Sequence, residues 1–430
     1  MKIPPYVTVA FQLKHWPSRT RVSAEVSVTR ILVLASEQPP VTSGVARSVA
    51  TLATELMVRG HEVDVRSANN APRFVAGEFR FSGMAFDWPA IRRELSGYDV
   101  VNLHGPAPTI SDAFLALLAA MPRDERPPLV YTHHSNVDIR PWGPACAVYN
   151  RLHRRLAHHA DQVVVTTPSY AQLMAKVGRP HVETITWGVD AKSFDVTTAS
   201  RYDGTRPLRV LLVGQMRPYK GVPVLIDAVR GRPEIEATVV GSGPFADKYR
   251  ALAERTAPNV TCRGRVEDDE LVTLLLDHDV LALPSVSRAE AFGLVLLEGM
   301  AAGCVPVASD LPGVRDIAGP TGVLVRAGDP TDLRRALLAL AADPRRVTTL
   351  QRLSRRRAEQ VTWDRVGADY ERVLRATIAR VRAARGQPDE PPQQPDEPDI
   401  DDFTSRNGQI IDLTRLLADH AALPARHAAR

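Results

Sequence analysis

Two acidic residues, Glu290 and Glu298, are separated by eight positions in a segment that reads EAFGLVLLE and continues GMAAGCVPV. If a helix starts at Gly293, eight residues span roughly 12 Å, at about 1.5 Å per residue. That separation is too long for two carboxylates that share a metal ion or a proton. It fits two groups that hold opposite ends of one elongated ligand.

The sequence around this pair predicts a strand, a loop and a helix in succession. The strand is expected to end near Pro284, the loop carries Glu290, and the helix starts near Gly293. Backbone N–H groups at a helix N-terminus bind phosphate, and a glycine there lets a ligand approach the backbone closely. Glu298 can then accept hydrogen bonds from ribose hydroxyls, and Glu290 from those of a sugar. The alternative is two solvated carboxylates, but Glu298 lies inside the apolar run LVLLEGMAAG.

A second candidate site is the turn GQMRPYKG at 214–221, which directly follows the apolar run LRVLLVG. A strand-to-helix turn of this kind lies at the carboxyl edge of a parallel sheet, where ligands bind in such folds. The chain has six lysines against 48 arginines, and one of the six, Lys220, is in this turn. Its ammonium can neutralise charge that develops on a departing phosphate. A surface lysine without a role is disfavoured here, because a helix N-terminus repels cations.

Further candidates lie where predicted strands end or helices begin. Gly44 is in a glycine turn before a helix, which is either a ligand contact or a plain connection. His133 and His134 are adjacent on a strand, so their side chains point to opposite faces and cannot form a metal pair. At most one of them serves a cleft, and we assign that role to His134. His104, also at a strand end, is left open.

Two series of six apolar, β-rich runs alternate with helical patterns along the chain. Nearly continuous apolar strands separated by helices indicate parallel sheets covered on both faces, so we expect an α/β fold with two doubly wound domains. The expected strands are 30–36, 62–66, 100–104, 129–133, 162–166, 183–186, 208–214, 236–241, 260–264, 279–284, 305–309 and 322–326. The expected organisation is an N-terminal extension at 1–28, a first domain at 29–187, a linker at 188–207, a second domain at 208–362, a helix at 363–384 and a tail at 385–430.

Composition restricts the class of protein further. The 430-residue chain has a net charge of +5, but residues 387–402 hold seven acids and no base, so the rest is strongly basic and suits anionic ligands or an anionic membrane surface. The Pro-rich acidic tail, with QPDEP twice, predicts a disordered segment with a possible short helix at 410–417. No apolar run is long enough to span a membrane, and no signal peptide is recognisable. Three scattered cysteines indicate reduced thiols in a cytoplasmic protein.

These motifs, in this order and spacing, resemble the retaining GT-B glycosyltransferases with an E-x7-E motif, glycosyltransferase family 4. The similarity extends over about residues 29–384. The segments that carry it are EAFGLVLLEGMAAGCVPV (290–307), GQMRPYKG (214–221), VVGSGP (239–244) and WGVDAKSF (187–194), with weaker matches at HHSN (133–136), DQVVVTTPSY (161–170) and WDRVGADYERVL (363–374).

The resemblance implies two Rossmann-like domains that face a cleft, with helix 363–384 crossing back to the first domain. It implies that Glu290 contacts hydroxyls of the donor sugar, Glu298 the ribose and Lys220 the diphosphate. His134 would take the place of the family's active-site histidine. The other donor contacts implied are Gly44, Gln215, Arg217, Phe292, Gly293 and Leu294.

The chain departs from the family pattern at three positions. Gln215 stands where relatives usually have an arginine that helps to bind the diphosphate, and Arg217 is the candidate substitute. Trp187 replaces a common asparagine, and Ser43 replaces the first glycine of a usual pair.

The implied reaction is transfer of a hexose from a UDP- or GDP-sugar to an acceptor hydroxyl, with retention at the anomeric carbon. No cofactor, metal or nucleic acid is expected. The acceptor is expected to be a glycan, a lipid-linked molecule or a small molecule, in cell-envelope glycan, glycolipid or secondary-metabolite biosynthesis. The basic stretch 151–159 predicts either a peripheral contact with the inner face of a membrane or an ordinary solvated helix.

Two other functions remain open from the sequence. A non-hydrolysing sugar-nucleotide epimerase shares the two-domain architecture, although the E-x7-E and GQMRPYKG segments do not belong to its pattern. A nucleotide-binding scaffold with weak catalysis is the other, because Gln215 removes an expected phosphate contact.

Overall fold

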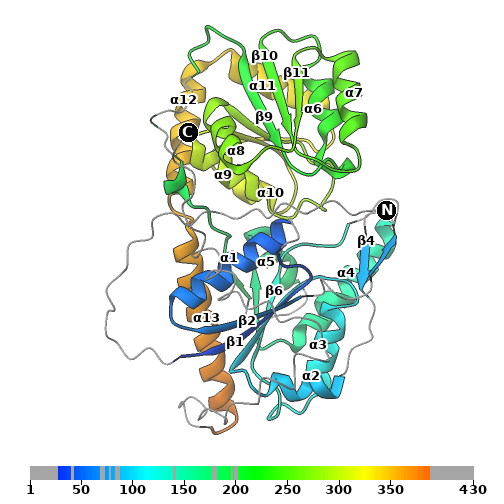
Figure 1. Cartoon of the computed structure of the whole chain (residues 1–430), viewed down its shortest axis with the longest axis vertical. Coiled ribbons are helices and arrows are strands. Elements are labelled where there is room, and N and C mark those ends of the chain that lie inside the picture. The colour runs from blue at the N-terminus through cyan, green and yellow to red at the C-terminus, as the bar shows by residue number, and fades with distance from the viewer. Residues whose placement is uncertain are drawn as a thin grey trace, which may run out of the picture. The chain divides into compact units, whose positions relative to one another are not determined.

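A computed structural model shows two six-stranded parallel sheets, one from each series of predicted strands (Figure 1). The predicted α/β class is confirmed, and all twelve predicted strands are present with ends shifted by at most two residues. The sequence did not predict an antiparallel pair, β3 (Arg73–Ala76) and β4 (Phe79–Ser82). The predicted extension and tail, apart from Val28 and residues 385–387, lie outside the described residues. The structure describes residues 28–39, 43–67, 73–76, 79–82, 88–138, 142–176, 182–194, 197 and 202–387.

The first sheet has the strand order β2-β1-β5-β6-β7-β8. Its central strands are buried on both faces, which explains why they are almost continuously apolar in sequence. Helices α1 and α13 cover one face, and α3 and α5 contact the other. The strands are β1 (Arg30–Ala35), β2 (Glu62–Ser67), β5 (Val100–Gly105), β6 (Leu129–His133), β7 (Gln162–Val165) and β8 (Val182–Thr184), and the helices are α1 (Gly44–Val58), α2 (Trp88–Leu95), α3 (Ser111–Ala120), α4 (Gly143–Leu156), η2 (Ala157–His159) and α5 (Pro168–Ala175).

The second sheet has the strand order β11-β10-β9-β12-β13-β14. Helices α6, α7 and α11 pack on one face, and α8, α9 and α12 on the other. The strands are β9 (Leu208–Val213), β10 (Ile235–Val240), β11 (Val260–Gly264), β12 (Val280–Leu283), β13 (Val305–Ser309) and β14 (Val323–Val325), and the helices are η5 (Pro218–Lys220), α6 (Val222–Val229), α7 (Ala246–Thr256), α8 (Asp268–Asp277), α9 (Leu294–Ala302), α10 (Val314–Ala318), α11 (Pro330–Ala341) and α12 (Pro344–Ala358).

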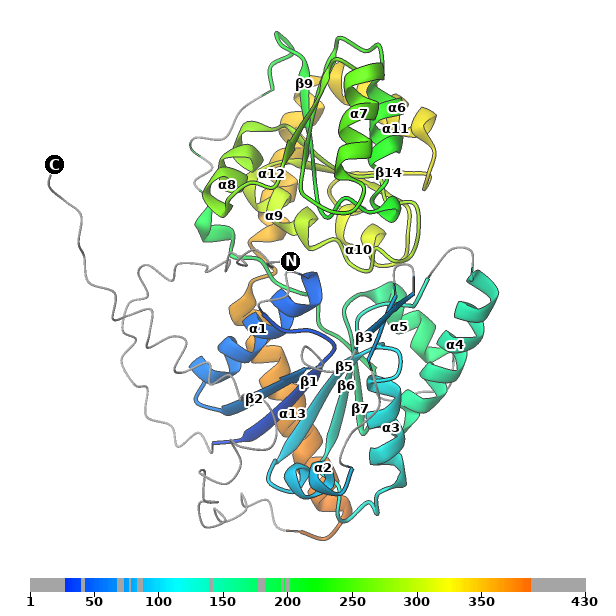
Figure 2. The ribbon, with the colours of Figure 1, turned by 45° about the vertical axis from the view of Figure 1, so that its right-hand side comes forward.

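The last described helix, α13 (Trp363–Ala384), follows the second sheet in sequence but packs on the first. It lies beside α1 in both views of the ribbon (Figures 1 and 2). Tyr370 on this helix contacts the hydroxyl of Thr132 in β6 at 3.2 Å, and Arg382 binds Asp99 at 2.9 Å.

The segment expected to be a linker, 188–207, begins directly after Trp187, which lies in a buried aromatic cluster. The Trp187 ring stacks on Tyr370 at 5.8 Å and lies 5.6 Å from the Trp363 ring. A Cβ on Gly188 would lie 2.5 Å from the backbone nitrogen of Trp363, so only glycine allows this approach. Val189, Ala191 and Phe194 are also buried, within the 3-10 helix η3 (Ala191–Ser193) or on either side of it. Trp187, which stands where relatives commonly have an asparagine, therefore packs against the start of α13.

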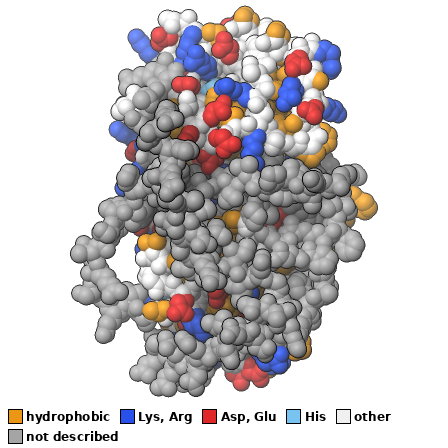
Figure 3. Space-filling view, in the orientation of Figure 1, with side chains coloured by type: hydrophobic (Ala, Val, Ile, Leu, Met, Phe, Trp, Pro, Cys, Tyr) orange, Lys and Arg blue, Asp and Glu red, His pale blue; other side chains and the backbone are white. Residues whose placement is uncertain are grey.

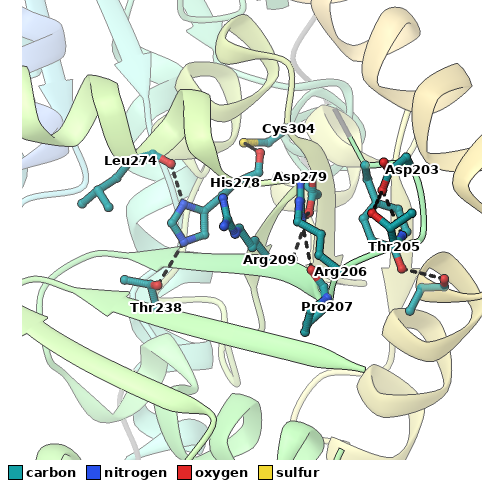
Figure 4. A network of polar contacts seen from close by, with 12 residues as sticks. Asp203, Thr205, Arg206, Pro207, Arg209, Thr238, Leu274, His278, Asp279 and Cys304 are labelled. Atoms are coloured by element: carbon teal, nitrogen blue, oxygen red, sulfur yellow. Dashed lines mark hydrogen bonds and ion pairs between the residues drawn. The ribbon is translucent and has the colours of Figure 1, made fainter. Parts of the chain in front are cut away.

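A buried ion pair lies at the amino-terminal ends of the strands of the second sheet. Both oxygens of Asp279 bind the Arg206 guanidinium, at 2.7 and 2.8 Å, and one also accepts from the N–H of Arg209 at the start of β9 (Figure 4). The adjacent His278 ring is held by the carbonyl of Leu274 and the hydroxyl of Thr238. Asp161 and Arg126 repeat the same bidentate pairing in the first sheet.

The order of strands places the carboxyl ends of β9 and β12 at a reversal of winding in the second sheet. From β9 the chain passes outward through β10 and β11, then crosses back to β12 on the other side of β9. In open α/β sheets, ligands bind at the carboxyl ends of the strands at such a reversal. The turns that follow β9 and β12 carry the two motifs predicted to bind ligand.

On the face of the second sheet's helices seen in Figure 3, acidic and basic side chains are interspersed.

Candidate active site

Backbone contacts join the turn after β9 to the loop after β12. The carbonyl of Tyr219 accepts from the N–H of Val286 at 2.8 Å. Gly221 has φ of 72°, and a Cβ on it would lie 1.9 Å from the carbonyl oxygen of Pro284. Gly221 is therefore needed both for its left-handed backbone and for the close approach. This contact fixes Lys220 relative to the loop after β12.

Lys220 and Glu290, predicted from separate motifs, form an ion pair in this arrangement. Nζ of Lys220 lies 2.6 Å from Oε2 of Glu290, and the two side chains are only 13% and 9% exposed. The hydroxyl of Ser285 donates to the same oxygen at 3.4 Å. Burial acts to lower the pKa of Lys220, but the Glu290 carboxylate and Tyr219 outweigh it, and the pKa is raised. Lys220 is therefore a buried cation at neutral pH.

Gln215 and Arg217 lie on the same turn as Lys220. The side-chain oxygen of Gln215 accepts from Nε of Arg217 at 3.0 Å. Gln215, which stands where relatives usually have an arginine, therefore binds the guanidinium of Arg217. Arg217 keeps a positive charge beside the turn.

The start of α9 combines several predicted residues. Gly293 has φ of 78° and no side chain caps the helix, so the first N–H groups of α9 are not bound by a cap. Phe292 is buried in the hydrophobic core. A Cβ on Gly44 would lie 3.4 Å from Cδ1 of Leu294. The structure thus brings the N-terminus of α1 against that of α9.

Glu298, one turn further along α9, is held by a residue that the sequence reasoning missed. Nη1 of Arg47 donates to Oε1 of Glu298 at 2.5 Å. Burial raises the pKa of Glu298, although Arg47 opposes the shift. Each carboxylate of the E-x7-E pair therefore has its own cation. The signal that could have found Arg47 is its position, three residues after Gly44 and on the first turn of α1.

His134 lies inside the aromatic cluster. Its Nε2 is 2.9 Å from Nδ1 of His104, and its ring stacks on Trp187 at 5.5 Å. Burial lowers the pKa of His134 to about 4 and that of His104 well below 6.5. Both rings are therefore neutral at physiological pH, and their partners are other core side chains.

His133 points to the opposite face of β6, as strand alternation requires. Its ring lies 5.6 Å from the ring of Tyr170 on α5. Tyr170 in turn touches the position of a Gly313 Cβ, at 3.0 Å, and the carbonyl of Ala291 lies 2.0 Å from that same position. Packing through Tyr170 therefore connects His133 to the loop of Glu290, although His133 itself is only 1% exposed.

Among the residues that the structure describes, no group of three or more His, Cys, Asp or Glu side chains is placed to hold a metal ion. In the same part of the chain, no helix combines the length and the apolar character needed to cross a bilayer.

Two doubly wound domains, each built on a six-stranded parallel sheet, are the architecture of the GT-B glycosyltransferases. Comparison with family models agrees: residues 42–193 match the model for Glycosyltransferase Family 4, and residues 207–343 match the model for Glycosyl transferases group 1. The chain belongs to this family of glycosyltransferases.

Individual relatives support the same conclusion. The chain is 32% identical to the D-rhamnosyltransferase WbpZ of Pseudomonas aeruginosa over 63% of its length and 71% of the relative. It is also 32% identical to the phosphatidyl-myo-inositol mannosyltransferase of Mycobacterium tuberculosis, over 70% of its own length and 82% of the relative. Sucrose-phosphate synthase from Thermosynechococcus elongatus has the same fold, with a TM-score of 0.66, 21% identity, and coverage of 82% of this chain and 100% of that one. HepE of Anabaena, in complex with UDP and glucose, matches with a TM-score of 0.60 and 19% identity over 80% of this chain and 99% of that one.

Proposed function

We propose that this glycosyltransferase moves a hexosyl unit from a nucleoside diphosphate sugar to an acceptor hydroxyl, with retention at the anomeric carbon and without a metal ion. The observation that carries the proposal is the buried Lys220–Glu290 pair at the carboxyl ends of β9 and β12. A fixed cation beside an uncapped helix N-terminus suits a diphosphate, and a fixed carboxylate suits sugar hydroxyls.

Different side chains of the site bind different parts of the donor in this proposal. Glu290 accepts hydrogen bonds from hydroxyls of the transferred sugar, and Glu298 accepts those of the ribose. As the bond to the sugar breaks, negative charge grows on the diphosphate, and Lys220 together with the N–H groups of α9 stabilises it. Arg217 supplies a second positive charge, and the departing phosphate takes the acceptor proton. We keep the assignment of the active-site histidine to His134, because His134 is 7% exposed, whereas His133 is 1% exposed and its Nε2 is inaccessible.

The relatives favour a donor sugar of the manno configuration. They are named for transfer of mannose and of D-rhamnose, which is 6-deoxymannose. We infer that this chain takes a UDP- or GDP-linked sugar with an axial 2-hydroxyl.

The test combines binding with product analysis. Purified protein is screened by calorimetry against UDP- and GDP-linked mannose, rhamnose and glucose, and the best donor is then used with lipid, glycan and small-molecule acceptors in the presence of EDTA. Release of nucleoside diphosphate, with retained anomeric configuration in the product by NMR, is the expected result. Conversion of the donor into a second nucleotide sugar without acceptor would instead indicate an epimerase, and loss of activity in EDTA would exclude metal independence.

We further propose that α4 contacts an anionic membrane, where a lipid acceptor would be presented. Exposed apolar side chains occur on this helix at Val148 and Leu152, which are 60% and 56% exposed, and just before it at Trp142, which is 65% exposed. Basic side chains on this helix and close to it in the fold line an open hollow, namely Arg151, Arg154, Arg155, His158 and Lys176. Apolar side chains next to a cluster of cations are the composition of a helix that lies in the membrane interface.

Vesicle co-sedimentation at low salt tests this surface. The wild-type protein is expected to bind vesicles with an anionic lipid and not vesicles of phosphatidylcholine alone, and Arg151→Glu/Arg155→Glu is expected to abolish binding. The control is Arg352→Glu/Arg356→Glu on α12, which makes the same change in charge on another exposed helix. Equal binding by both double variants would show that α4 is an ordinary solvated helix.

A further inference from the structure

An ion pair between Arg47 on α1 and Glu298 on α9 joins the first domain to the second. Nη1 of Arg47 donates to Oε1 of Glu298 at 2.5 Å, although 251 positions separate the two residues in the chain. Both side chains reach solvent, since that of Arg47 is 48% exposed and that of Glu298 is 21% exposed. Within the part of the chain that the structure describes, no second donor reaches the carboxylate, so Oε2 is accessible to a ligand.

The start of α1 fixes the backbone of Arg47. Ser43 caps the helix, because its hydroxyl accepts from the N–H of Ala46 at 3.1 Å and its carbonyl accepts from the N–H of Arg47 at 3.0 Å. Serine is among the preferred N-cap residues, whereas the glycine that is usual in relatives at position 43 has no side chain to accept the first of these bonds. The departure from the family pattern at Ser43 therefore orders the turn that carries Arg47.

The first turns of α1 and α9 pack against each other. A Cβ on Gly44 would lie 3.4 Å from Cδ1 of Leu294, and one turn further along both helices Arg47 meets Glu298. Residues three or four positions apart lie on the same face of a helix, so the two contacts use one face of α1 and one face of α9. The packing of the two helices therefore sets the position of the ion pair.

Arg47 also balances the charge of Glu298. Burial raises the pKa of Glu298, the Arg47 guanidinium opposes this rise, and the carboxylate of Asp268 at the start of α8 adds to it. An ionised carboxylate only accepts hydrogen bonds and does so at both oxygens, whereas a protonated carboxyl group has turned one oxygen into a donor. Glu298 is therefore better able to accept from several hydroxyls when Arg47 is paired with it.

We propose that Arg47 is a positioning residue that determines specificity for the ribose, because it holds Oε1 of Glu298 from the first domain while Oε2 accepts from a ribose hydroxyl of the donor. The site then rejects a nucleotide that lacks this hydroxyl, since the carboxylate oxygen would be left without its partner. Recognition of the ribose thus needs one residue from each domain. The inference rests on the proposed function, because it requires a nucleoside diphosphate in the site.

Equilibrium binding tests the proposal without turnover and without an acceptor. Calorimetry measures the Kd of UDP, of GDP, and of the 2′-deoxy and 3′-deoxy forms of each. The wild type is expected to bind the ribonucleotide at least about tenfold more tightly than the form that lacks the contacted hydroxyl. Arg47→Met is expected to reduce this ratio to about threefold or less, and Arg47→Lys, which keeps the positive charge, to retain more of it. Arg59→Met is the matched control, because Arg59 follows the other end of α1 and binds Asp364, and its ratio should equal that of the wild type.

A double-mutant cycle shows whether Arg47 acts through Glu298. Glu298→Gln should lose the same discrimination, and Arg47→Met/Glu298→Gln should discriminate no less than Glu298→Gln alone. In turnover, Arg47→Met is expected to raise the donor KM and to leave kcat within about threefold of the wild type, because Lys220 and Glu290 keep their positions. A fall in kcat at unchanged donor KM would place Arg47 in the chemical step and contradict the proposal.

The remaining outcomes separate this inference from the proposed function. An unchanged ratio in folded Arg47→Met would overturn the inference alone. Tighter binding of the ribonucleotide by Arg47→Met would also overturn it, because Arg47 would then compete with the ribose for Glu298. Failure of the wild type to bind either UDP or GDP would instead overturn the proposed function, and the inference with it.

Discussion

Lys220 and Glu290 meet at 2.6 Å although 70 residues separate them in the chain. Each comes from a turn at the end of a strand, and the two strands, β9 and β12, are neighbours in the second sheet. The sheet topology therefore assembles the pair, and Gly221 against Pro284 sets its spacing.

Removing one partner of the Lys220–Glu290 pair should damage both the reaction and the fold. Lys220→Met and Glu290→Gln are each expected to lower kcat/KM by about 10²- to 10³-fold. The first variant loses the cation that stabilises charge on the diphosphate, and the second loses the carboxylate that accepts hydrogen bonds from the sugar. Lys220→Met also leaves a buried carboxylate unpaired and should lower the free energy of unfolding by about 3 kcal/mol. The double variant should regain most of that stability while remaining inactive. Thermal unfolding and initial rates of the wild type and the three variants form the double-mutant cycle, and additive losses of stability would show that the pair does not interact.

The backbone contact between the two turns makes a separate prediction. Gly221→Ala places a methyl group 1.9 Å from the carbonyl of Pro284, so the turn must shift and Lys220 must move with it. Donor affinity, measured by calorimetry, is expected to fall by about tenfold or more. Gly231→Ala is the matched control, since Gly231 also has positive φ, at 66°, but no atom lies within 4 Å of its Cβ position. Gly231→Ala should cost only about 1 kcal/mol of stability and leave donor affinity unchanged.

The sequence was sufficient for those parts of the site that follow from local pattern. Apolar runs predicted both sheets, and the glycines near Lys220 and Glu290 predicted turns at strand ends. Arg47 and Tyr170 were missed because their contacts with Glu298 and the Glu290 loop join segments more than 100 residues apart. Strand alternation predicted that His133 and His134 point to opposite faces, but which face meets the site depends on how α5 and α13 pack.

The two adjacent histidines should respond differently to substitution. His134→Gln is expected to lower kcat by about 10²-fold, because the family resemblance places this ring beside the reacting sugar. His133→Phe keeps an aromatic ring against Tyr170 and is expected to leave kcat within a few-fold of wild type. Initial rates at saturating donor measure the difference. The reverse ranking would assign the histidine of the active site to His133.

The buried pair His104–His134 should make the fold sensitive to acid. The pKa of His134 is about 4 in the folded chain and about 6.5 when unfolded, so between these values the unfolded chain binds a proton that the folded chain does not. Stability is therefore complete above about pH 6.5 and falls as the pH drops toward 4, by about 3 kcal/mol for His134 at 1.36 kcal/mol per unit. Urea unfolding at pH 7 and pH 5 measures the loss. It should be smaller in His134→Phe, and an unchanged slope in that variant would assign the acid sensitivity to other groups.

The Arg206–Asp279 pair should support the fold without affecting the reaction. Asp279 is fully buried and binds Arg206 at the amino end of the second sheet, on the opposite edge from Lys220. Arg206→Met leaves the carboxylate with the N–H of Arg209 as its remaining strong donor, so it is expected to lower the free energy of unfolding by about 3 kcal/mol. The control is Arg250→Ala, because Arg250 pairs with Asp247 at the surface, where the two side chains are 45% and 96% exposed, and such pairs contribute about 0.5 kcal/mol or less. Circular dichroism melts compare the two, and kcat/KM at 25 °C should equal the wild-type value in both. Equal melting temperatures for Arg206→Met and Arg250→Ala would show that burial of the Asp279 pair adds nothing to stability, and a lower kcat/KM in Arg206→Met would show that the amino edge of the sheet is coupled to the site.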